Sequence, residues 1–429
     1  MFDLEKFYNE YADGEKKDFS ELIRYLNSFK YVIIRGAAKQ GEAVGKKLLE
    51  EKVKITAYWD VRAAELRTVN GIKVEMPFEN EYPRDETVII YAIPNNVIIY
   101  GLMAELKRNG YKNIVRGDAL YAILICQYKN GDILSAVKCW QSGGECRSLM
   151  CPKAERIIRG YATEEKEGER IDLAYGCFLI NSVCNLSCRD CSQYIPNYPA
   201  HARNNVPFEI ISRDIDKYFD IIDTVGAVSV MGGETFLHPD IAKIANKFSE
   251  KKTFGFISFP TNGLCEIKPE QLEGIEDPRI VIVFGNYLHR ATEQQKEIYY
   301  KNIELVKKYK IAYSISQPLP SWIDAGGLKK LDVDENYMTN KKQSCMMPPR
   351  NLQVKNGKVH TCDKGVAIYN MGIADYPTDY LDLTLDLPRA EYREKFREFR
   401  DRAFYYTCGH CENLGKNVEC AIQGVKNVL

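Results

Sequence analysis

The sequence lacks a long apolar run, a basic apolar leader and an excess of charge of either sign. No apolar stretch approaches the roughly 20 residues that a membrane helix needs, and the first residues, Met-Phe-Asp-Leu-Glu-Lys, do not look like a secretion signal. We therefore expect a cytoplasmic protein with no membrane partner. Lys and Arg together number 59, as do Asp and Glu, so the charge balance does not favour nucleic acid as a partner.

The length and the cysteine content give positive information about domain number and metal binding. A chain of 429 residues is too long for one ordinary domain and suggests two or three. No internal repeat is evident. Fourteen cysteines occur without a secretion signal, and cytosolic thiols are normally kept reduced, so metal ligation is favoured over disulfides.

Three of these cysteines stand close together, in the order Cys184, Cys188 and Cys191. Three thiolates can hold a metal centre and leave one coordination position open for chemistry. From the spacing alone, a zinc knuckle or three ordinary cysteines is the alternative. The spacing C-x3-C-x2-C resembles that of the radical S-adenosylmethionine (SAM) superfamily. The resemblance implies a [4Fe-4S] cluster whose fourth iron binds SAM, a 5′-deoxyadenosyl radical that abstracts hydrogen, and a need for anaerobic conditions.

Strands and helices alternate around this motif. The pattern predicts strands at 178–180, 227–230, 255–258, 279–284 and 311–315, and helices that include 213–223 and 293–308. Such alternation gives a parallel sheet that can curl into a partial barrel, with ligand sites at the carboxyl ends of the strands. The cysteine motif directly follows the first strand, so we expect it at this catalytic rim.

Further strand ends carry polar or glycine-rich segments. Gly232, Gly233 and Glu234 follow the second strand, where glycines allow a close approach to a ligand and a carboxylate can receive an ammonium group. In the radical SAM family this segment contacts the SAM amino group. Asn262, after the third strand, is the candidate ribose contact. Asp190 stands where the family often has an aromatic residue, and we expect Tyr194 to substitute in packing against adenine.

A second set consists of Cys345, Cys362, Cys408 and Cys411. The run Val354-Lys-Asn-Gly-Lys-Val359 contains Asn356-Gly357, which suits a type I′ turn, and predicts a hairpin in which Lys355 pairs with Lys358. The four cysteines predict a closed metal site, for which spacing leaves zinc and iron–sulfur open. The arrangement resembles the twitch domain, the shorter relative of the SPASM domain, and implies an auxiliary [4Fe-4S] cluster.

The N-terminal part reads as a separate α/β unit. Strands are expected at 31–35 and 87–91, at 113–115 and before Asp60, with helices at 42–52 and 97–109. The turn Gly36–Gly41 imitates a dinucleotide fingerprint, but Ala38 replaces its second glycine. The segment resembles the Rossmann-like domains attached to bacterial sugar-modifying enzymes and methyltransferases. Nucleotide binding and a docking role both remain open.

Together these observations predict an α/β protein with four parts. They are a Rossmann-like parallel sheet with an N-terminal helix (1–130), a connector (131–172), a partial (β/α)6 radical SAM barrel (173–335) and a small twitch/SPASM-like cluster-binding domain (336–429). Other cysteines, at the following positions, are expected to be core, loop or surface thiols, with the last also a possible exchanging ligand: Cys126, Cys139, Cys146, Cys151, Cys177, Cys265 and Cys420.

The leading functional hypothesis is a radical SAM oxidoreductase acting on a carbohydrate or nucleotide-linked sugar. An auxiliary cluster is a natural acceptor for the electron lost when a hydroxyl-bearing carbon radical becomes a carbonyl. Such an enzyme needs an external one-electron donor such as flavodoxin or ferredoxin. Epimerisation, peptide or protein maturation and a scaffold without catalysis are the alternatives. Tyr287, His289 and Arg350 are the candidate substrate contacts.

Overall fold

The computed structural model describes residues 6–7, 10, 19–92, 105–125, 168–316, 321–345, 351–412 and 416–428. The chain divides into two compact units, Met1–Ile157 and Ile158–Leu429. Within the described ranges, no helix is long and apolar enough to cross a membrane. Arg350, the four connector cysteines at 126, 139, 146 and 151, and most of the helix expected at 97–109 lie outside the described residues.

The N-terminal unit contains a six-stranded sheet in the order β3-β4-β2-β1-β5-β6. Its neighbouring strands are parallel except for the β3–β4 pair, so the predicted parallel α/β arrangement is confirmed. Its strands are β1 (Tyr31–Arg35), β2 (Ala57–Trp59), β3 (Thr68–Val69), β4 (Ile72–Glu75), β5 (Thr87–Tyr91) and β6 (Asn113–Arg116). Its helices are α2 (Phe19–Asn27), α3 (Lys39–Glu50), α4 (Ala63–Leu66) and α6 (Gly117–Ile125).

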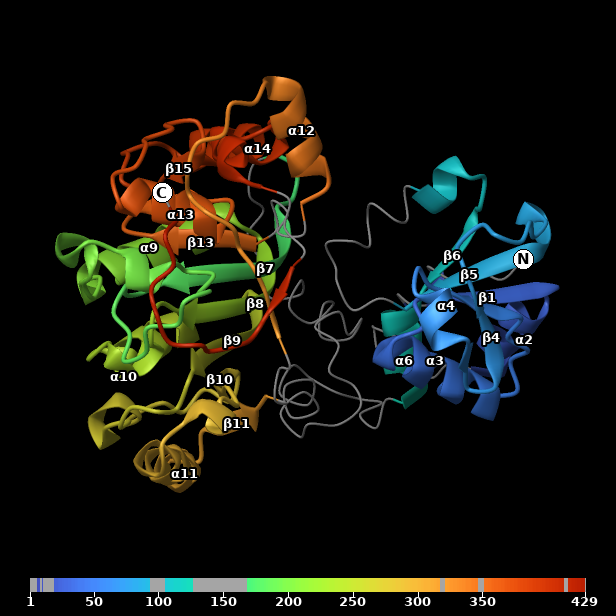
Figure 1. Ribbon diagram of the computed structural model, residues 1–429, viewed down its shortest axis with the longest axis horizontal. Helices are drawn as coiled ribbons and strands as arrows, with labels where there is room; N and C mark the ends of the chain where they lie inside the picture. The colour runs from blue at the N-terminus through green and yellow to red at the C-terminus, as the bar shows by residue number, and fades with distance from the viewer. Residues whose placement is uncertain are drawn as a thin grey trace. The chain divides into compact units, whose positions relative to one another are not determined.

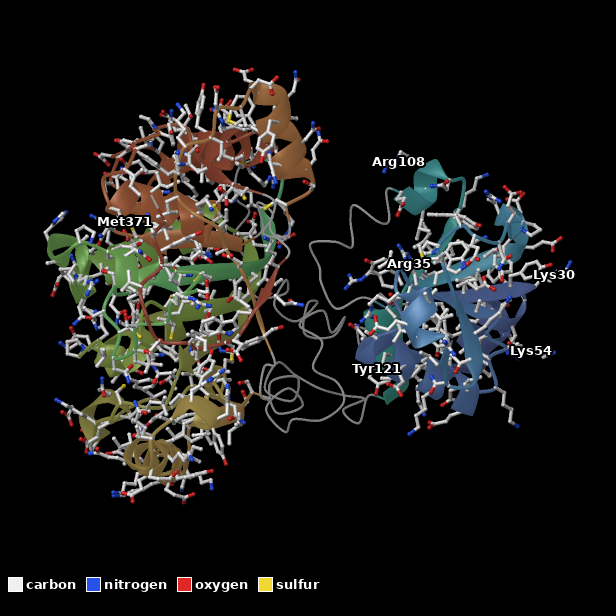
Figure 2. The ribbon with its side chains drawn as sticks, viewed as in Figure 1. Lys30, Arg35, Lys54, Arg108, Tyr121 and Met371 are labelled. Carbon is white, nitrogen blue, oxygen red and sulfur yellow. The ribbon has the colours of Figure 1, made fainter. Side chains whose placement is uncertain are left out.

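Alternate residues of β1 enter two cores, one on each face of the sheet. Val32 and Ile34 belong to a large apolar cluster with residues of α2, α3 and α6, whereas Ile33 packs with Trp59 in a smaller aromatic cluster. A strand buried on both faces reads as a continuous apolar run, as this one does. Figure 2 labels Arg35, the residue that ends β1.

Asp60, which follows β2, fixes the turn after β1. Its Oδ2 accepts the Ala37 N–H at 2.9 Å, and Arg62 donates to Oδ1 at 3.1 Å. Burial acts to raise the pKa of Asp60, but the hydrogen bonds from Arg62 and Ala37 outweigh it and the pKa is lowered. A Cβ on Gly41 would lie 1.9 Å from the Gly36 carbonyl oxygen, so this glycine serves close packing of the turn.

The second unit is built on an eight-stranded sheet in the order β11-β10-β9-β8-β7-β13-β14-β15. The strands β7 to β11 are parallel and follow one another down the sheet in Figure 1. They are β7 (Asp172–Leu179), β8 (Thr224–Met231), β9 (Phe254–Thr261), β10 (Ile280–Phe284) and β11 (Ala312–Ile315). The connecting helices are α9 (Phe208–Ile221), α10 (Ile241–Ser249) and α11 (Glu293–Lys308). The mixed α/β fold with parallel sheets is thus confirmed.

The sheet continues into the C-terminal part without a break. β13 (Asn351–Lys355) pairs in parallel with β7, although the two strands are far apart in the sequence. β14 (Lys358–His360) and β15 (Tyr380–Asp382) add antiparallel strands. Lys355 is opposite Lys358, as predicted, and Asn356 and Gly357 have φ of +48° and +76°, which a type I′ turn requires. The sheet therefore crosses the expected domain boundary at 335/336.

The remaining elements of this unit lie outside the eight-stranded sheet; among them, α13 packs on β13 and β14 and α14 on β15, near which Figure 1 shows both helices. Arg393 of α14 is fully buried and its Nη1 donates to Asp223 at 3.1 Å and to the Ile221 carbonyl at 2.5 Å. This buried ion pair fastens α14 to the segment between α9 and β8. These elements are β12 (Trp322–Ile323), α12 (Glu335–Gln343), α13 (Asp363–Asn370), α14 (Arg389–Asp401) and β16 (Asn417–Val418).

The two faces of the sheet have different surroundings. Phe178 and Val230 pack with residues of α9, α10 and α14 in the main apolar core. Cys177 and Leu179, on the other face, pack with Val366 of α13. Buried polar residues also lie on this second face, among them Ser229 and Gln353, which pair with Cys177, and Lys355.

Candidate functional site

The cysteine motif forms the loop that leaves the carboxyl end of β7. Cys184, Cys188 and Cys191 are all partly buried thiols, and the Cys191 N–H donates to the Cys188 carbonyl at 3.2 Å, which curls the loop. Burial raises the pKa of Cys184 to about 12 and also raises the pKa of Cys188 and Cys191. Metal ligation requires thiolates, so a bound metal must overcome this shift.

Gly232 and Gly233 make room for this loop at the end of β8. A Cβ on Gly232 would lie 2.2 Å from Asn181 Oδ1, and one on Gly233 would lie 2.1 Å from the Val183 carbonyl oxygen. Asn181 joins the two segments, since its Oδ1 accepts the Gly233 N–H at 2.9 Å and its Nδ2 donates to the Glu234 carbonyl at 2.8 Å. The glycines thus allow the cysteine loop to approach.

The Glu234 carboxylate joins the ends of β8 and β9. It is 1% exposed and accepts hydrogen bonds from Thr261 Oγ1 at 2.6 Å, the Asn262 N–H at 2.8 Å and the Phe236 N–H at 3.0 Å. Burial raises its pKa, and these donors oppose the shift. Both oxygens accept hydrogen bonds within the chain, so the side chain positions the rim; its contact with the SAM amino group stays a prediction.

Asn262 and Tyr194, the other expected SAM contacts, also have partners inside the protein. Asn262 Nδ2 donates to Asn185 Oδ1 at 2.8 Å, a bond that reaches into the cysteine loop. Tyr194 is 3% exposed and its hydroxyl donates to the Ala325 carbonyl at 2.9 Å. Tyr194 lies in an apolar cluster with Leu328 and residues of α13; Met371, labelled in Figure 2, packs against the same cluster.

Asp190, which interrupts the family pattern, holds an ion-pair network. Its Oδ2 accepts from Arg189 at 2.9 Å, and Lys426 lies 3.4 Å from Oδ1. Lys426 also pairs with Asp324 at 2.6 Å. The carboxylate therefore anchors the cysteine loop to a segment near the end of the chain.

That segment, residues 417–428, runs along the cysteine loop. The Gln423 side chain accepts the Ser187 N–H at 2.7 Å and donates to Cys188 Sγ at 3.4 Å. The Arg189 N–H donates to the Ile422 carbonyl at 2.8 Å. Nothing in the local sequence around Gln423 signals this role, and Asn181 was also missed, although its place directly after a strand was a usable signal.

Tyr287 and His289 follow the carboxyl end of β10. His289 Nε2 is 4.0 Å from Cys420 Sγ, and the Tyr287 ring meets the Trp322 ring at 5.9 Å between centroids. Burial raises the pKa of Tyr287 to about 12, helped by the nearby Cys420 and Cys188. The structure thus brings both residues and Cys420 beside the cysteine motif.

The second cysteine set comes together from three separate segments. Burial raises the pKa of Cys362 above its usual value despite a hydrogen bond from the Gly365 N–H, and Cys345 and Cys408 raise it further. Cys408 has a pKa of about 12, raised by burial and then by Cys345 and Cys411. The shifts of Cys362 and Cys408 thus have contributions from other thiols of the set, which places the four cysteines near one another.

The described residues contain no group of three His, Cys, Asp or Glu side chains that converges on the position of a single metal ion. In an iron–sulfur cluster each thiolate binds its own iron. The cysteines within each set therefore do not need to converge on one position. The donor sets, three thiolates and four thiolates, fit the ligand numbers of an open and a closed cluster. Cys177 is buried in the sheet, and Cys265 is partly buried near Glu234 and Cys184.

No family model matches the chain, and no curated protein matches it. Among solved structures, the chain is similar to native anSMEcpe with bound AdoMet, at 14% identity over 53% of this chain and 82% of that chain, with a TM-score of 0.36. It is also similar to BtrN in complex with AdoMet and 2-DOIA (17% identity, 57% and 95% of the two chains, TM-score 0.35). Streptococcus suis SuiB bound to S-adenosylmethionine matches at 16% identity over 54% and 68%, with a TM-score of 0.31. These scores are low, so the argument for function rests on the residues of the chain itself.

Proposed function

We propose that this protein is a radical SAM enzyme. The observation that carries the proposal is the packing of the segment 181–184, which leads into the cysteine loop and carries its first cysteine, against Gly232 and Gly233 at the carboxyl rim of a parallel sheet. Three thiolates on one rim loop leave one position of a cluster open. When bound, the cluster supplies the electron that cleaves SAM and releases a hydrogen-abstracting radical. An external one-electron donor such as flavodoxin or ferredoxin would supply that electron.

The residues around the loop hold it in one geometry. Asn181 joins it to the end of β8, Asn262 joins it to the end of β9, and Gln423 holds it from the other side. Ligand precision of this kind is what the surrounding shell of a metal site provides. Tyr287 and His289 stand at the rim, where a substrate would meet the open position.

We propose further that Cys345, Cys362, Cys408 and Cys411 hold an auxiliary [4Fe-4S] cluster and that the reaction is an oxidation. Abstraction of hydrogen from a carbon that bears a hydroxyl leaves a carbon radical. Loss of the hydroxyl proton and of one electron converts that radical to a carbonyl, and a closed cluster is a suitable electron acceptor. The favoured substrate is a carbohydrate or nucleotide-linked sugar, because the N-terminal α/β unit resembles modules attached to sugar-modifying enzymes.

The test uses the reconstituted, reduced full chain with SAM and a panel of sugars and nucleotide sugars deuterated at ring carbons. We expect substrate-stimulated 5′-deoxyadenosine that contains deuterium, and a carbonyl product. The variant Cys188→Ala is the matched control and should form neither. If no sugar stimulates 5′-deoxyadenosine or transfers deuterium, the assignment of substrate class is wrong.

Epimerisation is the second candidate, because Cys420 lies beside His289 and Tyr287. There the thiol would return a hydrogen atom to the substrate radical, and the thiyl radical would need one electron and one proton to regenerate the thiol. Cys420→Ser separates the two reactions. It should abolish solvent-deuterium incorporation into an epimerised product, whereas a dehydrogenase should keep its rate of carbonyl formation.

A further inference from the structure

Three buried side-chain atoms around the β13–β14 hairpin have no hydrogen-bond partner among the described residues: Gln353 Oε1, His360 Nε2 and Asp363 Oδ1. Gln353 is opposite His360 in the strand pairing, so both side chains leave the same face of the sheet. Asp363 begins α13, which packs on β13 and β14. A buried polar atom without a partner costs about 1–3 kcal/mol, so three together need an explanation.

Lys355 adds a buried cation to the same face. It lies two residues after Gln353 on β13 and is 4% exposed. Its Nζ stands 5.0 Å from the centre of the Tyr198 ring. Burial lowers its pKa to about 8, and no carboxylate of the described residues opposes that shift. Lys358, across the hairpin, differs in that it pairs with Asp382 at 3.0 Å and its pKa is raised.

This polar group lies next to the proposed reaction site. Gln353 pairs with Cys177 of β7, so Lys355 stands toward the carboxyl end of β7, from which the cysteine loop leaves. Tyr198 follows that loop, and its pKa is raised by burial and then by Asp363 and Cys191. The group therefore lies between the two cysteine sets, on the same face of the sheet as Cys177.

The unpartnered atoms define the chemistry of a ligand. A buried water would satisfy Gln353 or His360, but it would not compensate the charge of Lys355, which needs an anion. The oxygens of Gln353 and Asp363 accept hydrogen bonds, as a hydroxyl-rich molecule would supply. One ligand that meets both requirements carries several hydroxyls and an anionic group.

We propose that Lys355, Gln353, His360 and Asp363 form the recognition site for an anionic carbohydrate, a sugar phosphate or a sugar carboxylate. Lys355 binds the anionic group, and Gln353 and Asp363 accept from hydroxyls. The inference rests on the proposed function, because it names the substrate class of that same site. It makes no use of turnover, so binding can be measured separately from radical chemistry.

The experiment measures equilibrium binding to the cluster-loaded full chain by anaerobic calorimetry. The probes are glucose 6-phosphate, glucuronate, neutral glucose and inorganic phosphate. We expect at least one anionic sugar to bind at least 10-fold tighter than glucose and than phosphate, since it uses both halves of the site. Lys355→Met should lower the affinity for the anionic sugar at least 10-fold, about 1.4 kcal/mol, and leave the affinity for glucose unchanged. Lys358→Met is the matched control and should bind like the wild type.

Gln353→Leu provides a second variant that leaves the cation in place. This substitution should weaken the binding of the anionic sugar and of glucose alike, because both ligands use the hydroxyl contacts. The inference is overturned if neither anionic sugar binds the wild type, or if Lys355→Met binds both as tightly as the wild type does. Binding of an anionic sugar without stimulation of SAM cleavage would support this site while contradicting the proposed reaction.

Discussion

Single residues at the rim are constrained by neighbours far away in the sequence. Gly233 is the clearest case, because a Cβ there would lie 2.1 Å from the Val183 carbonyl oxygen and 3.0 Å from Cys184 Cβ. Both contacts are with the segment that carries the first cysteine, 49 or 50 positions earlier in the chain. Any side chain at 233 therefore displaces a proposed iron ligand.

We predict that Gly233→Ala lowers iron binding by the first cysteine set and SAM cleavage by roughly 10- to 100-fold. Anaerobic iron analysis and 5′-deoxyadenosine formation are the measurements. Gly365→Ala is the control, because its Cβ would meet neighbours only at 3.5 Å or more. If Gly233→Ala keeps full iron and activity, the close approach described for the loop is wrong.

Lys355 has a predictable effect of pH on stability. Its folded pKa is about 8 and the unfolded value is about 10.4, so below pH 8 the charge is buried at full cost. Between these values the unfolded chain binds the proton and the folded chain does not, so the stability of the wild type rises with pH. Tyr198 and His360 face Lys355, and Lys358 is opposite it across the hairpin.

We therefore expect ligand-free Lys355→Met to be more stable than the wild type at pH 7, by up to about 3 kcal/mol from the size of the shift. The difference in the free energy of unfolding between the variant and the wild type should be smaller at pH 9.5. Urea unfolding at pH 7 and at pH 9.5 measures this difference. Lys358→Met should behave oppositely and lose stability at pH 7, because Lys358 is paired with Asp382. A gain for Lys355→Met that does not change with pH would contradict the argument.

At the scale of the elements, the segment 417–428 has no regular secondary structure after β16 and makes several contacts with the cysteine loop. The backbone of Cys188 forms an isolated bridge with Gln423, and Gly424 donates to the Ser187 carbonyl at 2.6 Å. Hydrogen bonds to cluster sulfurs help to set reduction potentials. The Gln423 side chain, at 3.4 Å from Cys188 Sγ, is placed to do this.

We predict that Gln423→Leu lowers the midpoint potential of the first cluster, on the order of tens of millivolts, because a donor to a sulfur is lost. Redox titration followed by electron paramagnetic resonance measures the shift. Lys426→Met provides the comparison, since it loses ion pairs with Asp190 and Asp324 but no bond to sulfur. Equal shifts in both variants would mean that the segment acts only by holding the loop.

At the scale of the whole molecule, the chain has two separate compact units, and both cysteine sets lie in the second. Within that unit one sheet runs from β11 to β15. The open set follows β7, and Cys362 of the closed set follows β14, two strands away in the sheet. A continuous sheet thus holds the two proposed clusters in a fixed relation.

The metal content should divide between the two sets. Two [4Fe-4S] clusters require about eight irons per chain. We expect replacement of Cys184, Cys188 and Cys191 by Ala to leave about half, and replacement of Cys345, Cys362, Cys408 and Cys411 to leave the other half. Anaerobic iron, sulfide and zinc analysis decides this, with Cys177→Ala as a control that keeps all the iron. Zinc bound by the second set would contradict the auxiliary cluster.

Much of the fold was readable from local patterns. The strands at 31–35 and 87–91 and the helix at 293–308 have their predicted bounds, because apolar runs and a Thr292 capping box mark them locally. The helix expected from Glu42 begins earlier, at Lys39, where no side chain caps it. The pairing of β13 with β7 was not predicted, because no local signal specifies which strand becomes the neighbour of another.

The sequence by itself determined the cysteine spacing, the strand–helix alternation and the hairpin turn, because each depends on residues a few positions apart. Only the tertiary structure decided what surrounds them. It turned Glu234 and Tyr194 inward, brought Gln423 to Cys188 across 235 positions, and buried Lys355 without a carboxylate from the described part of the chain. These features depend on packing between distant segments, for which the chain carries no local pattern.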